Sequence, residues 1–307
     1  MATPPVLPLM PMTNEPVIQY SLFNDSPTEP IVNVASVPHR SPFRYPGGKT
    51  WLVPRIRQWL AGKKPGPETF IEPFAGGGIV GLSVAFENLA KKVVLVEIDE
   101  DVGAVWKTIL NGEAEWLANR IQTFPFSAEA VDEVLDEVPS SLRAHAFQTI
   151  LRNRISRGGI LAPGSGRIKR GENGRGLASR WYPDTLAKRI RAIAHMAHRI
   201  QFIQDDGLKI MEAFAEDASA CFFIDPPYTA AGKKAGARLY RHSEIDHEAL
   251  FEIASNVSGD FLMTYDNAEG IHAMAQRHHF ETFAIPMKNT HHAKMTELLI
   301  GRDLSWV

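Results

Sequence analysis

Two short apolar runs, each followed by a helical pattern, limit the fold of this chain more than any other feature of its sequence. The run in ETFIEPFAGGG is followed by IVGLSVAFENLA, in which Val80, Val84 and Leu89 fall near one helical face. The run in KKVVLVEID is followed by EDVGAVWKTILNG, a helical pattern that ends at Asn111-Gly112. Strand, helix, strand, helix is typical of a parallel sheet, so the sequence predicts an α/β protein.

The same kind of pattern returns after a long interruption. Apolar runs resume in IQFIQDD, CFFID, DFLMTYD, ETFAIPM and ELLIGRD, whereas the stretch before them is mostly helical, with a glycine-rich basic part at 157–180. We therefore predict a sheet domain built from residues 41–112 and 196–307, interrupted by an insert at 113–195. Residues 1–40 are rich in proline, which removes backbone donors and restricts φ, so we expect an extension without regular structure.

Composition narrows the class of protein. The chain has 307 residues and a formal net charge of -2, so an attraction to nucleic acid must come from local clusters of charge. Its single cysteine, Cys221, cannot form a disulfide framework within one chain and suits a reducing compartment. No run is long enough to span a bilayer, and the first residues do not resemble a secretory signal. We expect a cytoplasmic protein without a membrane partner.

A glycine-rich turn after the first apolar run predicts a cofactor site. Gly76, Gly77 and Gly78 lie between a strand and a helix, where the backbone can approach a ligand closely and N–H groups are free. Glu97 ends the next strand about 20 residues on, where an acid can bind two ribose hydroxyls. NAD and S-adenosylmethionine (SAM) are the main candidates. Glu72 favours SAM, because a carboxylate there repels a pyrophosphate but can accept the ammonium of a methionine moiety.

The segment CFFIDPPY predicts where the chemistry takes place. Asp225 follows a buried strand and so lies at the sheet edge where ligands bind. Pro226 and Pro227 have no N–H to donate, and their rings limit the movement of Asp225 and Tyr228. Asp225 and the Pro226 carbonyl can accept the two N–H bonds of an exocyclic amine, while Tyr228 stacks on the base. These bonds favour a tetrahedral nitrogen whose lone pair can attack an activated methyl group.

Basic residues gather in the insert. Only Glu172 and Asp184 oppose the arginines and lysines between residues 152 and 199. This one-sided excess is typical of a phosphate-binding surface, and a glycine-rich basic hairpin could enter a DNA groove; a solvated basic face is the alternative. The residues predicted to contact DNA are Arg154, Arg157, Arg167, Lys169, Arg170 and Arg175.

Four motifs, in order, resemble the Dam-type (D12 class) family of adenine-N6 DNA methyltransferases. They are FRYPGGKT at 43–50, FIEPFAGGG, LVEID and DPPY at 225–228, and the resemblance runs from about residue 42 to 303. It implies a Rossmann-like, mostly parallel methyltransferase sheet flanked by helices, with an inserted, mostly helical target-recognition domain. It also implies SAM as the cofactor and double-stranded DNA as the substrate.

The resemblance further implies roles for individual residues. Asp225, Pro226, Pro227 and Tyr228 would hold a flipped adenine while the methyl group is transferred to N6. Lys49 would lie near the SAM carboxylate and Asp206 near the SAM adenine, with Asp205 in reserve. The full set implied in SAM binding is Tyr45, Lys49, Glu72, Phe74, Gly76, Gly78, Glu97, Asp206 and Asp225.

One stretch departs from the family, and several points stay open. RNRISRGGILAPGSGRIKRG stands where family members have an FNGL-type recognition segment, so the target sequence is not predicted. N4 of cytosine as the acceptor, a partner restriction endonuclease, and a monomer or weak dimer also stay open. Two rival activities fit the motifs: an RNA or protein methyltransferase with a similar loop, and a DNA-binding regulator that has lost catalysis. Methyl transfer needs no metal, and the late histidines match no usual zinc spacing.

Overall fold

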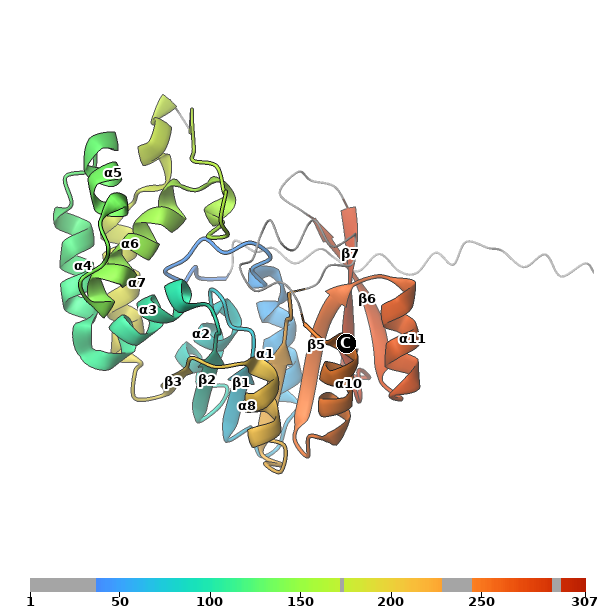
Figure 1. The fold of residues 1–307 in the computed structure, drawn as a ribbon. Helices are drawn as coiled ribbons and strands as arrows, with labels where there is room; N and C mark the ends of the chain where they lie inside the picture. The colour runs from blue at the N-terminus through green and yellow to red at the C-terminus, as the bar shows by residue number, and fades with distance from the viewer. Residues whose placement is uncertain (1–36, 172–173, 228–244, 289–293) are drawn as a thin grey trace, which may run out of the picture. The chain divides into compact units, whose positions relative to one another are not determined.

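One sheet organises the part of the chain that a computed structural model describes, namely residues 37–171, 174–227, 245–288 and 294–307. Within these residues seven strands follow the order β3-β2-β1-β4-β5-β7-β6 (Figure 1). The strands are β1 Thr69–Glu72, β2 Lys92–Val96, β3 Ile200–Ile203, β4 Ala220–Ile224, β5 Asp260–Asp266, β6 Glu281–Lys288 and β7 Lys294–Gly301. Strands β1 to β5 pair in parallel, whereas β7 is antiparallel to both β5 and β6.

Helices cover both faces of the sheet. The helices that pack on the sheet are α1 Val53–Ala61, α2 Ile79–Phe86, α3 Glu100–Thr108, α8 Gly207–Ala213, α10 His247–Asn256 and α11 Glu269–Arg277. Successive strand residues point to opposite faces, so Phe70 and Phe223 join the core beneath α1, α2 and α3, whereas Ile71 and Phe222 join the core beneath α8, α10 and α11. Strand β4, ACFFI, is buried and apolar throughout, which is typical of a parallel sheet covered on both faces.

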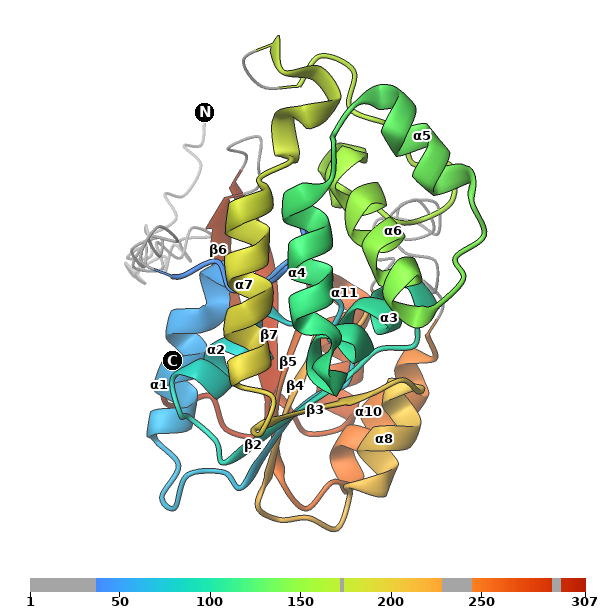
Figure 2. The same ribbon diagram turned by 90° about the vertical axis from the view of Figure 1, so that its left-hand side faces the viewer.

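A helical layer extends from α3. Its helices are α4 Ala114–Thr123, α5 Ala128–Asp136, α6 Leu142–Ile155 and α7 Pro183–His195. Helix α6 packs on α3, and α4 packs beside α7 (Figure 2). The predicted helix stop is confirmed, because Asn111 and Gly112 leave helical geometry, with Gly112 at φ 93°, and α4 begins two residues later.

The predicted fold class is confirmed: a mixed seven-stranded, Rossmann-like sheet is flanked by helices in the described residues. The boundaries of the insert at 113–195 stay a prediction. Most of the expected proline-rich extension, up to residue 36, lies outside the described residues. Among the described helices, none has the length and apolar character required to cross a bilayer.

Candidate active site

Four predicted acids lie at the carboxyl ends of neighbouring strands. Glu72 ends β1, Glu97 follows β2, Asp206 follows β3 and Asp225 follows β4. Because these strands are parallel and adjacent, their carboxyl ends share one edge of the sheet. The strand order reverses between β1 and β4, and open α/β sheets bind ligands at such a point. The tertiary structure therefore gathers the predicted acids at the edge where a nucleoside is expected.

The glycine turn follows β1 along this edge. Gly76 and Gly78 have φ values of 46° and 59°, the left-handed region that favours glycine, and Gly78 is the N-cap of α2. The buried Trp106 indole on α3 donates to the Gly76 carbonyl at 3.0 Å and so fixes the turn from below. A rigid backbone without Cβ atoms is what a close-lying nucleoside needs.

Tyr45 covers the glycine turn from the FRYPGGKT segment. A Cβ atom placed on Gly76 would collide with the Tyr45 ring, and one placed on Gly77 would lie 2.9 Å from the Tyr45 Cβ. The Ser41 hydroxyl also donates to the Gly77 carbonyl at 2.5 Å. The predicted neighbours Tyr45, Gly76 and Gly78 are therefore brought together, and the first motif forms one wall of the loop.

Glu97 faces the glycine turn. Its two carboxylate oxygens accept from the amides of Gly76 and Asp99, each at 2.9 Å. Burial raises the pKa of Glu97 to about 7, although both of these amides favour the charged form. A carboxylate at this place has lone pairs to accept from ribose hydroxyls, which fits the predicted role.

Ile98 is a candidate cofactor contact that the sequence reasoning missed. It directly follows Glu97, and its side chain is 43% exposed although it is large and apolar. An exposed aliphatic side chain beside a ribose acid can pack on the face of a nucleoside base. The signal was present in LVEID, where an apolar residue stands between two acids.

Glu72 is buried behind the turn. Only 4% of it is exposed, and its Oε2 accepts from the Gly81 amide on α2 at 2.7 Å. Burial raises the pKa of Glu72 to about 8, with the nearby charge of Asp225 adding to the rise and the Gly81 amide opposing it. Any Cβ on Gly81 would lie 2.7 Å from Oε2, so this close approach requires glycine.

Asp225 is held by two donors on one oxygen. Its Oδ1 lies 2.9 Å from the Lys49 ammonium and accepts from the Thr264 hydroxyl on β5 at 2.8 Å. The Asp225 side chain is 20% exposed, so its carboxylate reaches the surface at the carboxyl end of β4.

Lys49 is bonded to two carboxylates of the protein. It is buried, and its ammonium lies between Asp225 and Glu297, at 2.9 Å from each; its place near the SAM carboxylate stays a prediction. It also donates to the Gly47 carbonyl at 3.2 Å. With its N–H groups directed at protein acceptors, Lys49 acts on Asp225 here, and Glu297 is a second residue that the sequence reasoning missed.

The two other predicted cofactor residues lie beside each other. Asp206 is the N-cap of α8 and accepts from the Leu208 amide at 2.9 Å. A Cβ on Gly207 would lie 2.9 Å from the Phe74 ring, so Phe74 borders the start of α8. Among the predicted catalytic residues, Pro226 is buried and Pro227 is half-buried, whereas Tyr228 lies outside the described residues.

Five of the six basic residues predicted to contact DNA are exposed. They are Arg157, Arg167, Lys169, Arg170 and Arg175. Arg167 is ion-paired with Asp132, and the Arg175 guanidinium lies 5.6 Å from the centre of the Tyr182 ring. These residues follow α6, on a segment in which Ser156 and Arg167 form an isolated antiparallel β-bridge.

Arg154 is the exception and requires a correction. It is 4% exposed and donates to the Pro42 carbonyl, so it points into the protein. Burial lowers the pKa of Arg154 to about 9, and the neighbouring charges of Arg189, Arg44 and Arg180 lower it further. A buried guanidinium that ties α6 to the first motif is not placed to reach a phosphate, so we remove Arg154 from the predicted DNA contacts.

Asn153 is a third residue that the sequence reasoning missed. It is fully buried; its Oδ1 accepts from the Arg44 amide at 2.9 Å, and its Nδ2 donates to the carbonyls of Arg44 and Gly159 at 2.8 and 2.7 Å. It thereby joins α6 to the residue before Tyr45. Asparagine in a helical pattern gives no sequence signal for such a contact.

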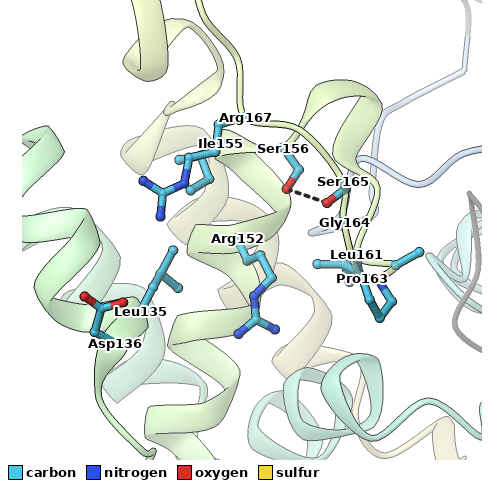
Figure 3. A pocket seen from close by; sticks show the side chains of 11 residues that line it. Leu135, Asp136, Arg152, Ile155, Ser156, Leu161, Pro163, Gly164, Ser165 and Arg167 are labelled. Carbon is cyan, nitrogen blue, oxygen red and sulfur yellow. Dashed lines mark hydrogen bonds between the residues drawn. The ribbon is translucent and has the colours of Figure 1, made fainter.

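A cavity of about 440 Å³ lies within the basic region (Figure 3). It is bordered by the end of α5, by α6 and by residues 161–167. Both of its arginines are ion-paired, Arg152 with Asp101 at 3.0 Å and Arg167 with Asp132. None of the acids at the sheet edge borders it, so it is separate from the candidate active site.

The fold and the site together define a Rossmann-like α/β protein in which four acids and a glycine turn meet at the carboxyl ends of the parallel strands. The model of the D12 class N6 adenine-specific DNA methyltransferase family matches residues 45–151. This match confirms the resemblance over the segment that contains Tyr45, the glycine turn and Glu97. It supports methyltransferase activity and implies SAM as the methyl donor.

Comparisons with whole proteins add the following similarities. A methyltransferase from Geobacter sulfurreducens is 14% identical at a TM-score of 0.37, covering 85% of this chain and 81% of that one. The rRNA methyltransferase aviRa from Streptomyces viridochromogenes is 14% identical at a TM-score of 0.36, covering 84% and 86%. No curated protein matches the chain. Among the described residues, no three His, Cys, Asp or Glu side chains are grouped to hold a metal ion.

Proposed function

We propose that this protein transfers the methyl group of SAM to N6 of an adenine flipped out of double-stranded DNA. The observation that carries the proposal is the state of Asp225. Lys49 and Thr264 hold its Oδ1, and its side chain is 20% exposed at the carboxyl ends of the parallel strands, beside the glycine turn. The family match over residues 45–151 supports the same reaction.

The cofactor fits the groups beside Asp225. Glu97 would accept from the ribose hydroxyls, Ile98 would pack on the base, and the backbone of Gly76 and Gly78 would lie against the nucleoside. Glu72 would accept the ammonium of the methionine moiety in its charged form, which a nearby positive charge would favour although burial raises the pKa of Glu72. When bound, SAM supplies a methyl group activated by a sulfonium sulfur.

The residues of this chain would then orient and polarise the target amine. Asp225 Oδ2 and the Pro226 carbonyl accept its two N–H bonds, which favours a tetrahedral nitrogen with an exposed lone pair. The lone pair would form the new N–C bond, the S–C electrons would stay on sulfur, and the methylated nitrogen would release one proton to solvent. Because Asp225 is already ordered by Lys49 and Thr264, little reorganisation is needed when positive charge develops on the nitrogen.

The exposed basic residues support DNA as the substrate. Arg157, Arg167, Lys169, Arg170 and Arg175 would contact phosphates or base edges while the adenine leaves the stack, at a cost of roughly a few kcal/mol. We place the protein in the cytoplasm, where both DNA and SAM are available.

Methylation assays with radiolabelled SAM test the proposal. Duplex DNA, single-stranded DNA, RNA and protein are offered in parallel, and the labelled DNA is digested and analysed for N6-methyladenine and N4-methylcytosine. We expect label in N6-methyladenine from duplex DNA. Label only in RNA or protein, or only in cytosine, would overturn the proposal.

The variant Asp225→Asn links this activity to the site. Its amide keeps the shape of the side chain but removes the charge and one acceptor, so we expect kcat to fall by about 10²- to 10³-fold or more. Binding of the SAM analogue sinefungin should stay within a few-fold of wild type. An Asp225→Asn enzyme with unchanged kcat would remove Asp225 from the mechanism.

A further inference from the structure

Lys49 lies in a buried cluster with two carboxylates. Its ammonium is 2.9 Å from Asp225 Oδ1 and 2.9 Å from Glu297 Oε1, and Lys49 and Glu297 are each only 4% exposed. The three residues come from the first motif, the end of β4 and the middle of the sheet's antiparallel strand. Asp225 has a proposed role, whereas Glu297 has none so far.

Glu297 reaches the site because of the direction of β7. In the register of β5 and β7, Glu297 pairs with Asp266, the last residue of β5. The antiparallel strand thus contributes a residue to the edge where the parallel strands end. Because Glu297 is buried and bonded to Lys49, its carboxylate restricts where the Lys49 ammonium can lie.

The charges of the cluster bear on the reaction. Lys49 and Asp225 alone would sum to zero. Glu297 adds a second carboxylate beside Lys49, and the half-buried Asp266 lies near enough for its pKa to respond to the charges of Lys49 and Asp225, so carboxylates outnumber the ammonium in this cluster. Methyl transfer moves positive charge from the sulfonium onto the amine nitrogen beside Asp225. A neutral Lys49–Asp225 pair would stabilise the positive charge on that nitrogen less than a net negative cluster does. Without Glu297, the Lys49 ammonium would offset more of the negative charge of Asp225.

We propose that Glu297 is a positioning residue for methyl transfer: it holds and neutralises Lys49, so that Lys49 orients Asp225 without cancelling its charge. This inference rests on the proposed function. Burial acts to lower the pKa of Lys49, but the charges of Asp225 and Glu297 outweigh it and raise that pKa above its ordinary value. The ammonium therefore stays charged throughout the working pH range.

The primary test is Glu297→Gln, with Asp260→Asn as a matched control. Asp260 is a carboxylate of the same sheet that is ion-paired with Lys63, but it begins β5 and so lies at the opposite edge. We expect Glu297→Gln to lower kcat by about 10- to 100-fold with sinefungin affinity within about 2-fold of wild type. Asp260→Asn should leave kcat unchanged, and Glu297→Asp should recover part of the loss.

The pH profile separates positioning from a structural role. Removing one of the two carboxylates lowers the pKa of Lys49. Because a neutral Lys49 no longer offsets the charge of Asp225, kcat of Glu297→Gln should recover part of its loss as the pH rises through that lowered pKa, whereas wild type should show no such rise. The same shift can be measured without turnover by NMR titration of ¹³Cε-labelled lysine, with Lys49→Met to assign the signal. An unchanged kcat, or an unchanged Lys49 titration, would overturn the inference.

The double variant Lys49→Met/Glu297→Gln tests the charge argument separately from the position of Lys49. It removes both charges and restores the net charge of the site to that of Asp225 alone. We expect its kcat to exceed that of Glu297→Gln; an equal or lower kcat would contradict the charge argument. Wild-type protein that methylates no adenine would instead refute the proposed function, while the lysine titration would still decide the role of Glu297.

Discussion

At Gly76, backbone conformation and packing both require glycine. Its φ of 46° favours glycine, and the Tyr45 ring occupies the place of a Cβ atom. We expect Gly76→Ala to lower sinefungin affinity by at least about 10-fold and to destabilise the fold by about 1–3 kcal/mol. Isothermal titration calorimetry and urea denaturation would measure the two effects.

Gly112→Ala is the control for this prediction. Gly112 also has a positive φ, 93°, but no atom lies within 4 Å of the place of its Cβ. It should show the strain cost without the loss of ligand affinity. Equal reductions of affinity in both variants would show that the Tyr45 contact is unimportant.

Glu72 predicts a pH dependence of stability. Its pKa is about 8 in the fold against 4.5 for the ordinary carboxyl group. A raised carboxyl pKa means that the folded state binds the proton more tightly than the unfolded state. The contribution of Glu72 to stability is therefore complete below about pH 4.5 and is lost as the pH rises through about 8. We expect Glu72→Gln to be more stable than wild type at pH 9, by up to a few kcal/mol.

Urea denaturation at pH 6 and pH 9 would check the sign. The advantage of Glu72→Gln should shrink toward pH 6, because Glu72 is largely protonated there and resembles the amide. A variant less stable than wild type at pH 9 would mean that the charged form of Glu72 is the favoured one in the fold.

At the scale of elements, α6 holds the first motif in place. Asn153 bonds both backbone groups of Arg44, and Arg154 donates to the Pro42 carbonyl. Replacing Asn153 with alanine removes these bonds from the two half-buried backbone groups of Arg44 and from the buried Gly159 carbonyl. We expect the free energy of unfolding to fall by about 2–4 kcal/mol and sinefungin affinity to fall as Tyr45 loses its support.

Asn119→Ala is the matched control on the neighbouring helix α4. Asn119 accepts from Arg191 at 2.8 Å but is exposed, so its removal should change stability by less than about 0.5 kcal/mol. If Asn153→Ala were as stable as this control, the bonds between α6 and the first motif would not contribute to the stability of the fold.

At the scale of the whole molecule, charge is unevenly distributed on a chain whose net charge is only -2. We expect the triple variant Arg167→Gln/Lys169→Gln/Arg170→Gln to bind duplex DNA more weakly. The slope of log K against log salt should fall in magnitude by about 0.9 for each DNA phosphate that the variant no longer neutralises. Fluorescence anisotropy at several salt concentrations would measure the slope.

The double variant Lys91→Gln/Lys92→Gln is the control for the salt dependence of DNA binding. Both lysines are exposed but lie at the amino end of β2, opposite the edge that holds Asp225. Their removal should leave the slope unchanged. If the triple variant kept the wild-type slope as well, the basic hairpin would not be the DNA surface.

The sequence by itself determined the features that depend on neighbours along the chain. Apolar runs and helical spacing predicted the strands and helices, the glycines after β1 predicted a turn, and Asn111-Gly112 predicted the end of α3. Order along the chain also predicted that Glu97 ends a strand and that Asp225 lies at the edge where ligands bind, and both do follow parallel strands.

Only the tertiary structure decided which charges are buried and which groups they face. Arg154 and Arg157 look alike in the sequence, but one turns into the protein toward Pro42 and the other is exposed. Glu297 faces Lys49 because β7 lies beside β5 and runs against it. The physical reason is that burial and ion pairing depend on distances between residues far apart in the chain, which local patterns do not specify.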